Sequence, residues 1–310
     1  MNNVCDREAV NNMSMQEVFR PDFLSADKAD RSLLADTNSI ASGAKGNEGD
    51  NYPVAIAMLG RFQLLLDGEP CDFGRKAPRR PLELLKLIVA QGGREVSISR
   101  LISLMWPEAE GDNAAGSFDA TLHRLRKILN DKRIIVLRDG KISLDRRYCW
   151  VDVWVFERLV DGVRRVLRSV PAGDRQDEFL DVYSGEMMKL YQGHFLSGEE
   201  VTAWSVSTSE RLRYKYIHAL IETGRYWESH GNWERAIECY QKGIDVDDLV
   251  EVFYQRLMNC YLETERLSES MMVYRRCRQV MSVVLGLQPE GATGVLYSRV
   301  KAARVSVQSA

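Results

Sequence analysis

The chain has 310 residues, 45% of them hydrophobic, and a formal net charge of −2 at pH 7. This length predicts two or three domains, and the absence of a signal-peptide pattern and of any apolar run near the ~20 residues of a membrane span predicts a soluble, cytoplasmic protein. The six cysteines form no Cys-x-x-Cys pair, which argues against a zinc site or a disulfide framework and predicts reduced, mostly buried thiols.

The charge is unevenly distributed along the chain. Residues 1–50 carry a net charge of −4, residues 51–150 carry +5, and residues 151–310 carry −3. Within the basic segment, residues 113–150 hold nine Lys or Arg against four Asp or Glu. For charge alone, a solvated charged surface is the simpler interpretation. The order of the predicted elements in this segment favours nucleic-acid binding instead.

The N-terminal part of the chain changes character near residue 52. Residues 1–51 are rich in Asn, Ser, Asp and Gly, and they predict a disordered tail. Their glycines form no phosphate loop, because no strand precedes them and no Gly-Lys-Ser/Thr follows. Two apolar runs at 55–59 and 62–66 are followed by Asp67-Gly68, a hairpin signal, and together they predict a small sheet.

Three helices follow in the predicted order. Apolar residues recur at helical spacing over residues 80–91, and Gly92-Gly93 supplies the stop. Ser97 is placed to cap a second helix over residues 98–105, which Trp106-Pro107 ends. The third helix covers about 113–129. These helices predict a trihelical core.

The third helix has two different faces. Its apolar face is formed by Phe118, Leu122, Leu125 and Leu129. At about 100° per residue, the opposite face carries Gly116, Ala120, His123, Arg124 and Lys127, with Ser117 and Thr121 on one flank and Arg126 on the other. We interpret the outward face as the surface that enters a DNA groove.

A hairpin follows this helix and supplies a cationic wing. Its strands, at 134–137 and 142–144, flank the turn Asp139-Gly140, which places Arg138 and Lys141 at the tip. A helix followed by a wing is the layout of winged helix-turn-helix proteins. The predicted DNA-binding residues are Ser117, Ala120, Thr121, His123, Arg124, Arg126, Lys127, Arg138 and Lys141.

The chemistry of their side chains indicates which of these residues are best suited to contact a base. A guanidinium pairs bidentately with guanine O6 and N7, so Arg124 is the first choice for a base contact. The small Gly116 and Ala120 would let the helix approach the groove floor, although an ordinary exposed helix face has the same pattern. Arg126 is as well placed to pair with Asp119 or with a phosphate as to read a base.

Residues 54–150 resemble the OmpR-type winged helix, with a leading four-strand sheet, three helices, a hairpin, and a recognition-helix pattern at 119–127 (DATLHRLRK). Residues 151–160 (VDVWVFERLV) then lead into a long helical region, as in the bacterial transcriptional activator domain. The two parts together resemble the Streptomyces antibiotic regulatory protein family. Further matching positions are LGRF at 59–62, YSG at 183–185 and LGLQP at 285–289, although the family commonly has Trp in place of Tyr183.

This resemblance implies a transcriptional activator associated with the nucleoid. It implies binding to promoter repeats in double-stranded DNA as a homodimer or tandem pair, and contacts with the RNA polymerase holoenzyme. We expect no cofactor, because the sequence contains no phosphate loop and no metal-ligand spacing.

The C-terminal region contains a repeat with a shift of 34 residues. The shift relates Trp227 to Tyr261, Ala236 to Ser270, Ile237 to Met271 and Tyr240 to Tyr274. This is the period of a tetratricopeptide helix pair, and the aromatic residues in it are predicted to pack in the core. A solenoid of such pairs offers a concave surface for a partner.

The sequence gives little support to an enzyme. The four histidines have no metal-ligand spacing and no nucleophile motif accompanies them. The predicted fold class is mainly α with a small β component, a winged helix-turn-helix followed by a tetratricopeptide-like helical domain. The expected domains are a disordered tail at 1–51, a DNA-binding domain at 52–150 and an activator domain at 151–305. The alternative function is a helical-repeat signalling adaptor whose winged helix binds protein.

Overall fold

The computed structural model describes residues 52–74, 77–108, 111–169 and 173–308, so the tail expected at 1–51 lies outside the described residues. The chain forms two compact units. The first unit contains the described residues up to Arg158 together with Lys189–Arg211, and the second contains Leu159–Met188 and the residues from Leu212 onward. The division between them therefore falls at other points than residue 150. Each unit is described by itself below.

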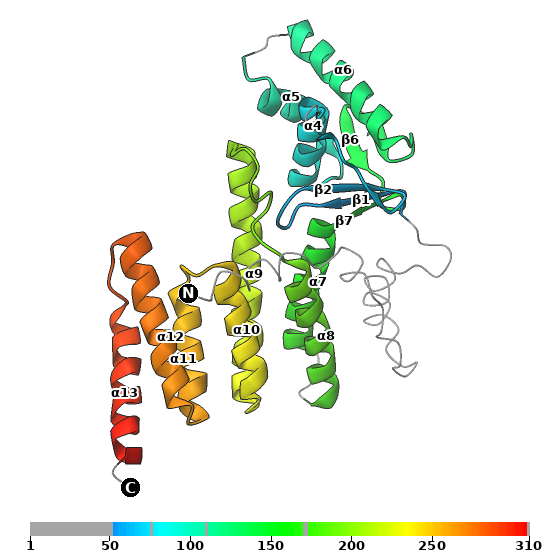
Figure 1. Cartoon of the computed structure of the whole chain (residues 1–310). Helices are drawn as coiled ribbons and strands as arrows, with labels where there is room; N and C mark the ends of the chain where they lie inside the picture. The colour runs from blue at the N-terminus through cyan, green and yellow to red at the C-terminus, as the bar shows by residue number, and fades with distance from the viewer. Residues whose placement is uncertain (1–51, 75–76, 109–110, 170–172, 309–310) are drawn as a thin grey trace. The chain divides into compact units, whose positions relative to one another are not determined.

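The first unit begins with a four-stranded sheet, of which Figure 1 labels β1, β2 and β7. Its strands are β1 (Val54–Ala57), β2 (Gln63–Leu66), β3 (Glu69–Pro70) and β7 (Cys149–Val151), in the order β3-β2-β1-β7. Asp67 and Gly68 both have positive φ and form the turn between β2 and β3, as predicted. The expectation of four leading strands was wrong, because the fourth strand comes from after the wing and pairs parallel with β1.

The trihelical core lies beside this sheet. Its helices are α4 (Arg79–Ala90), α5 (Ile98–Met105) and α6 (Gly111–Leu129), close to the predicted bounds. The Ser97 hydroxyl accepts a hydrogen bond from the Arg100 amide and caps α5 as predicted. Gly92 and Gly93, both with positive φ, end α4, since few other residues adopt that conformation at low cost. The α4 residues Leu84, Leu85 and Ile88 are completely buried.

A second sheet forms the wing. It contains β4 (Val96–Ser97), β5 (Ile135–Arg138) and β6 (Lys141–Leu144) in the order β4-β6-β5. The β5–β6 hairpin was predicted, but β4 was not, because a two-residue strand leaves no alternating pattern. β4 pairs with β6 at Val96↔Ile142 and Ser97↔Lys141. The wing is thus held by the segment that also caps α5.

A buried carboxylate joins the start of α7 (Asp152–Ser169) to the first sheet. Asp152 is 2% exposed, and its carboxylate accepts hydrogen bonds from the backbone N–H groups of Met58, Leu59 and Val153 at 2.6, 2.7 and 2.7 Å. The Trp154 indole N–H donates to the Gly92 carbonyl at 3.2 Å. These bonds fix the first turn of α7 against the end of β1 and the end of α4.

A distant segment completes the first unit. Backbone hydrogen bonds join Gly60 N to His194 O at 3.1 Å and Leu196 N to Met58 O at 2.8 Å, around an isolated bridge between Leu59 and Phe195. Phe195 and Leu196 are buried. Residues 194–197 therefore act as a short added strand beside residues 58–60, far from them in the sequence.

The second unit is helical. Its elements are the C-terminal part of α7, α8 (Asp174–Leu190), the C-terminal part of α9 (Ala203–Ser229), α10 (Trp233–Val246), α11 (Glu251–Glu263), α12 (Leu267–Val280), the short π-helix η2 (Met281–Leu285) and α13 (Gly291–Gln308). Corresponding boundaries of two helix pairs lie 34 positions apart. Ser229 and Glu263 end their helices, Trp233 and Leu267 begin theirs, and Val246 and Val280 end theirs. The structure thus confirms the 34-residue period.

The matched positions of the repeat lie in the core, with one exception. Trp227, Tyr261, Ala236, Ser270, Ile237, Met271 and Tyr240 are all buried. Tyr274 is only half-buried, and its ring stacks on Tyr297 of α13 with centroids 3.9 Å apart. The prediction for Tyr274 failed because α13 replaces the next repeat at this position.

Candidate nucleic-acid interface

The two faces of α6 have the predicted orientation. Ala114, Phe118, Leu122, Leu125 and Leu129 are buried, at most 4% exposed, on the side that packs against α4. The exposed side carries Gly116, Ala120, His123, Arg124 and Lys127. The 3.6-residue period fixes this division, because Phe118, Leu122, Leu125 and Leu129 are spaced three or four residues apart.

Thr121 is a correction to the predicted surface. It is 6% exposed, and its hydroxyl donates to the Ser117 carbonyl at 2.7 Å. Thr121 follows Phe118 by three residues and precedes Leu125 by four, so its side chain falls beside both on the buried side. Thr121 therefore lies on the buried face and not on the predicted outward surface, and Ser117 and Arg126 on the flanks are each half-buried.

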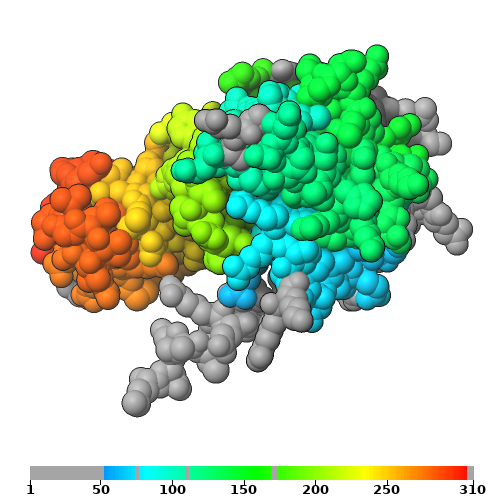
Figure 2. All heavy atoms as spheres, turned by 90° about the horizontal axis from the view of Figure 1, so that it is seen from above, coloured from blue at the N-terminus to red at the C-terminus, as the bar shows by residue number. Residues whose placement is uncertain are grey.

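The cationic side chains on the exposed face of α6 form no hydrogen bonds or ion pairs with other described residues. Within the described residues, Arg124, Lys127 and His123 have no hydrogen-bond or ion-pair partner. Arg126 and Asp119, which the sequence allowed to pair, form no pair there either. Figure 2 shows the surface of this part of the chain, in green, open on the face seen from above. A ligand with phosphate groups would therefore compete with no existing salt bridge on this helix.

The wing presents two more cations. Asp139 and Gly140 have φ of 51° and 70°, which gives the tight turn between β5 and β6. Arg138 and Lys141 are directly paired across the strands, so their side chains lie on the same face of the hairpin. Arg138 contacts Asp139 at 3.3 Å and Lys141 contacts Glu95 at 3.8 Å, and all four side chains are at least half exposed. Exposed pairs of this kind contribute roughly 0 to 1 kcal/mol, so a phosphate could replace either carboxylate.

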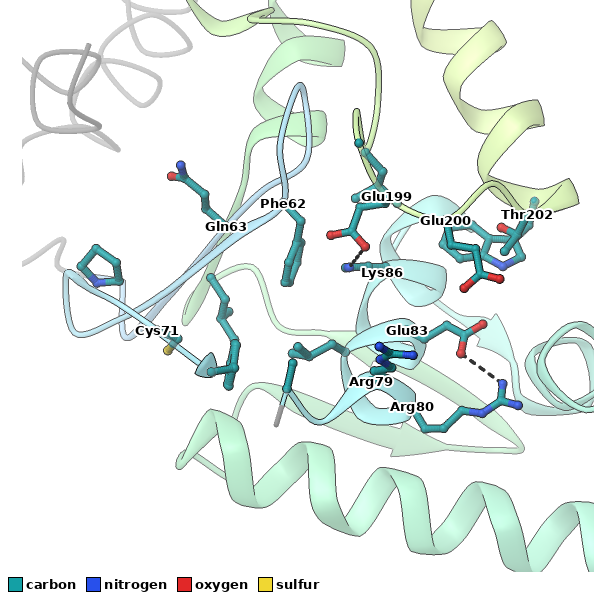
Figure 3. A pocket seen from close by; sticks show the side chains of 18 residues that line it. Phe62, Gln63, Cys71, Arg79, Arg80, Glu83, Lys86, Glu199, Glu200 and Thr202 are labelled. Atoms are coloured by element: carbon teal, nitrogen blue, oxygen red, sulfur yellow. Dashed lines mark hydrogen bonds and ion pairs between the residues drawn. The ribbon is translucent and has the colours of Figure 1, made fainter. Parts of the chain in front are cut away.

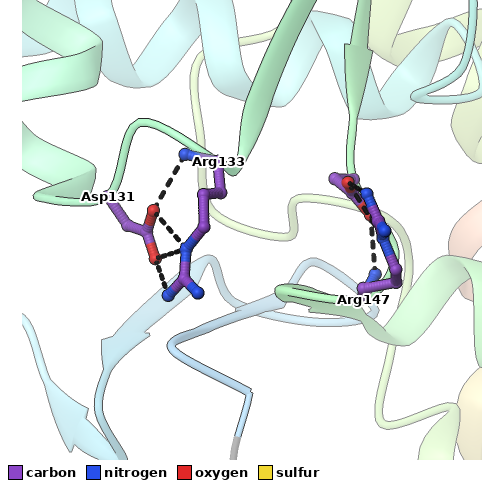
Figure 4. A network of polar contacts seen from close by, with 4 residues as sticks. Asp131, Arg133 and Arg147 are labelled. Carbon is purple, nitrogen blue, oxygen red and sulfur yellow. Dashed lines mark hydrogen bonds and ion pairs between the residues drawn. The ribbon is translucent and has the colours of Figure 1, made fainter.

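The base of the wing holds arginines of a different kind, shown in Figure 4. Arg133 donates to the carboxylate of Asp131, and Arg147 donates to that of Asp145, with shortest contacts of 2.7 and 2.6 Å. Both guanidinium groups also lie over the Tyr148 ring, at 4.2 and 5.5 Å from its centroid.

These hydrogen bonds neutralise the two arginines. They hold the pKa of Asp131 and of Asp145 below its usual value, so both carboxylates remain charged partners. These two clusters are not among the predicted site residues, although Asp-x-Arg occurs at both places in the sequence. The repeated two-residue spacing was the signal available, because it lets an Asp accept the backbone N–H two positions later.

Among the described residues, the histidines and cysteines do not gather into a second site. His230 stacks on Tyr226 and His218 lies tilted against Tyr214, with ring centroids 4.1 Å apart in both cases. In the described part of the chain, no group of three His, Cys, Asp or Glu residues is placed to hold a metal ion. The described cysteines are free, and all but the half-buried Cys71 are buried, as expected.

None of the helices in the described ranges combines the length and the hydropathy that crossing a bilayer requires.

Comparisons with known proteins extend these observations. Residues 151–301 match the family model described as the bacterial transcriptional activator domain. Among solved structures, the chain is similar to Mycobacterium tuberculosis EmbR, determined in complex with a low affinity phosphopeptide. That likeness has a TM-score of 0.59 at 19% sequence identity and covers 83% of this chain and 69% of EmbR. A comparison with curated proteins found no match.

The likeness to EmbR concerns the fold. Its 83% coverage exceeds the share of either the winged-helix part or the helical part alone, so it extends over both. The predicted fold class, a winged helix followed by a mainly helical region, is thereby confirmed. The similarity in sequence is confined to residues 151–301, which match the model of the bacterial transcriptional activator domain.

Proposed function

We propose that the chain is a sequence-specific DNA-binding transcriptional activator. In this proposal the DNA-binding domain covers residues 52–150 and reads promoter repeats, while the activator domain covers residues 151–305 and contacts RNA polymerase at the nucleoid. The match of residues 151–301 to the bacterial transcriptional activator domain supports a role in transcription. The chain would bind repeated elements as a dimer or tandem pair.

The observation that carries DNA binding is the uncommitted cationic face of α6. Arg124 and Lys127 are exposed and unpaired within the described residues, and the small Gly116 and Ala120 lie on the same face. A helix of this shape fits the major groove, where Arg124 would pair with a guanine edge. His123, Ser117 and Arg126 would contact bases or phosphates at the sides.

The wing completes the proposed interface. Arg138 and Lys141 lie on one face of the hairpin and are held only by exposed ion pairs. We assign them to the phosphate backbone or the minor groove next to α6, since backbone contacts set the register of a reader on DNA.

The test is selection of bound sequences from a random duplex pool by the full chain, at two salt concentrations. We expect an enriched motif with a direct repeat, and we expect Arg124→Ala to enrich it less and to lose the base preference at one position of the motif. A chain that enriches no motif, and whose residual binding does not change with salt, would instead be an adaptor whose winged helix binds protein.

A further inference from the structure

A pocket lies in the first unit (Figure 3), and none of its lining residues belongs to α6 or the β5–β6 hairpin. Its volume is about 1210 Å³, enough for a metabolite-sized molecule. Its walls come from β2, the segment after β3, the first turns of α4, and residues 196–204. All of these belong to the same compact unit, so the pocket is a feature of that unit alone.

The apolar wall of the pocket offers aromatic surfaces. Phe62 and Phe73 are half-buried, and Trp204, at the start of α9, is 9% exposed. Leu82 and Leu196 also line the pocket. An apolar body of one or two rings would bury its surface against these side chains.

A buried cation lies in the same wall. The side chain of Lys86 is only 11% exposed, its ammonium lies 2.9 Å from a Glu199 oxygen, and it lies 4.1 Å from the centre of the Phe62 ring. An ammonium has three donors, and in the described residues no other acceptor contacts this one. A buried ammonium with one carboxylate partner thus keeps a donor available to a ligand.

A second cation at the pocket is uncommitted. Arg80 pairs with Glu83 at 3.1 Å, but Arg79 beside it has no partner within the described residues. The opposite rim carries Glu200, which is exposed and has no partner there either. The α4 side of the pocket therefore favours an anion, and Glu200 on the other side opposes one.

We propose that this pocket binds a small organic anion, with its carboxylate or phosphate between Arg79 and Lys86 and its apolar body against Phe62, Phe73 and Trp204. The anion uses the free donor of Lys86, so Glu199 need not leave. The bound molecule bridges α4 of the winged helix and residues 196–204, which lead into α9. The proposal does not depend on DNA binding.

The first test is calorimetric titration of the full chain, without DNA, with three probes of one shape: naphthalene-2-carboxylate, naphthalene-2-carboxamide and naphthalen-2-ylmethylamine. We expect the carboxylate to bind about tenfold more tightly than the carboxamide, a typical loss for an unmatched charged contact, and the amine not to bind. Equal binding of carboxylate and carboxamide, or binding of neither at about 10 mM, overturns the proposal.

Variants locate the site. Arg79→Gln and Lys86→Met should each weaken carboxylate binding about fivefold or more, whereas Arg100→Gln, an exposed arginine outside the pocket, should change it less than about twofold. Glu200→Gln should tighten it, because it removes a repelling charge. Arg79 is exposed, so its variant keeps the test decisive even if Lys86→Met fails to fold. Unchanged binding in Arg79→Gln, or amine binding that Glu200→Gln abolishes, overturns the assignment.

Discussion

Arg124 and Arg147 are both exposed arginines of the winged-helix part, but their guanidinium groups differ in what they already bind. Arg147 holds the carboxylate of Asp145 at 2.6 Å and lies over Tyr148, whereas Arg124 has no partner among the described residues. Only the free guanidinium gains its full set of hydrogen bonds on meeting a base or a phosphate. This difference provides a matched pair of variants.

Arg124→Ala should cost about 1 to 3 kcal/mol of binding free energy on the selected site and relax the base preference at one position. Arg147→Ala should change the affinity for the same duplex by less than about twofold, because its charge is already neutralised. Fluorescence anisotropy on the selected duplex and on a scrambled duplex measures both. An equal loss on both duplexes for Arg124→Ala would show that Arg124 contacts the backbone and reads no base.

Lys141→Ala should act differently, through the phosphate backbone. We expect a similar loss on every duplex and a plot of log K against log [salt] flatter by roughly one unit, because one fewer counterion is released. Titrations at four salt concentrations determine the slope. An unchanged slope would remove Lys141 from the proposed interface.

The buried carboxylate of Asp152 allows a prediction about the free energy of unfolding. In Asp152→Asn, an NH₂ group replaces one carboxylate oxygen, so the three N–H groups that Asp152 now satisfies cannot all find an acceptor. We expect the free energy of unfolding to fall by about 1 to 3 kcal/mol. Urea unfolding at pH 7 tests this, with the exposed Asp174→Asn as the control.

The same group predicts a pH dependence. Burial raises the pKa of Asp152 from 3.8 to about 6, while the three N–H donors oppose a larger rise. Between these two values the folded chain holds a proton that the unfolded chain has lost, so this contribution to stability is present below about pH 4 and is lost as the pH rises through 6. Unfolding curves at pH 4.5, 5.5 and 7 measure the free energy of unfolding. In the wild type it should include the part that is lost as the pH rises through 6, and in Asp152→Asn this part should be absent.

At the scale of elements, close approaches between helices decide where glycine is required. A Cβ added to Gly243 of α10 would lie 2.6 Å from the Phe253 ring of α11, whereas one added to Gly185 of α8 would meet nothing within 4 Å. Both glycines are within helices, so their intrinsic helix propensities are the same. Alanine substitutions at Gly243 and at Gly185 therefore distinguish the effect of side-chain packing from that of helix propensity.

Gly243→Ala should lower the free energy of unfolding by about 1 to 3 kcal/mol, because the added methyl group pushes α10 from α11. Gly185→Ala should leave it unchanged or raise it by up to about 1 kcal/mol. Chemical denaturation followed by circular dichroism compares them. If Gly243→Ala is as stable as the wild type, the two helices pack with more slack than their side chains indicate.

The elements also show which features the sequence could predict. The helix over 98–105 was found because Ser97, the apolar spacing and Trp106-Pro107 mark both ends within a few residues. β4 and β7 have two and three residues and pair with partners far along the chain, so no local pattern marks them. Thr121 was misplaced because a period of 100° per residue puts it at the edge of the apolar face, where packing against neighbours decides burial.

Local sequence patterns also indicated part of the candidate site, but they could not indicate contacts between residues that are distant in the sequence. The alternation of faces on α6 gave Arg124 and Lys127, and Asp139-Gly140 gave the tip of the wing. Which arginines are neutralised depends on contacts such as Arg133 with Asp131 and with Tyr148, and the latter joins residues fifteen positions apart. The pocket depends on residues 196–204 returning to α4, which no local pattern indicates.

At the scale of the whole molecule, the rates at which the cysteines are alkylated depend on how tightly the chain around them is packed. Burial raises the pKa of Cys260 and of Cys277 to about 12 and raises that of Cys149 and Cys239 as well, whereas Cys71 is only half-buried beside the pocket. A thiol must ionise and be reached before it is alkylated.

In native protein carrying Cys5→Ser, iodoacetamide should therefore modify Cys71 at least about tenfold faster than the four buried cysteines. Mass spectrometry of digested samples over time gives the five rates. Denaturant should make them nearly equal. Fast native modification of Cys277 would mean that the end of the helical repeat opens readily.

The strand-like pairing of residues 194–197 with 58–60 limits how the first unit can be transferred from this protein to another one. A gene segment ending near residue 151 would encode α6 and the wing but would leave out Phe195 and Leu196, which lie beside the end of β1. A chimera made by grafting that segment onto another regulator would lack these two residues. A graft that is to keep the fold of the first unit must therefore include residues 194–197 as well.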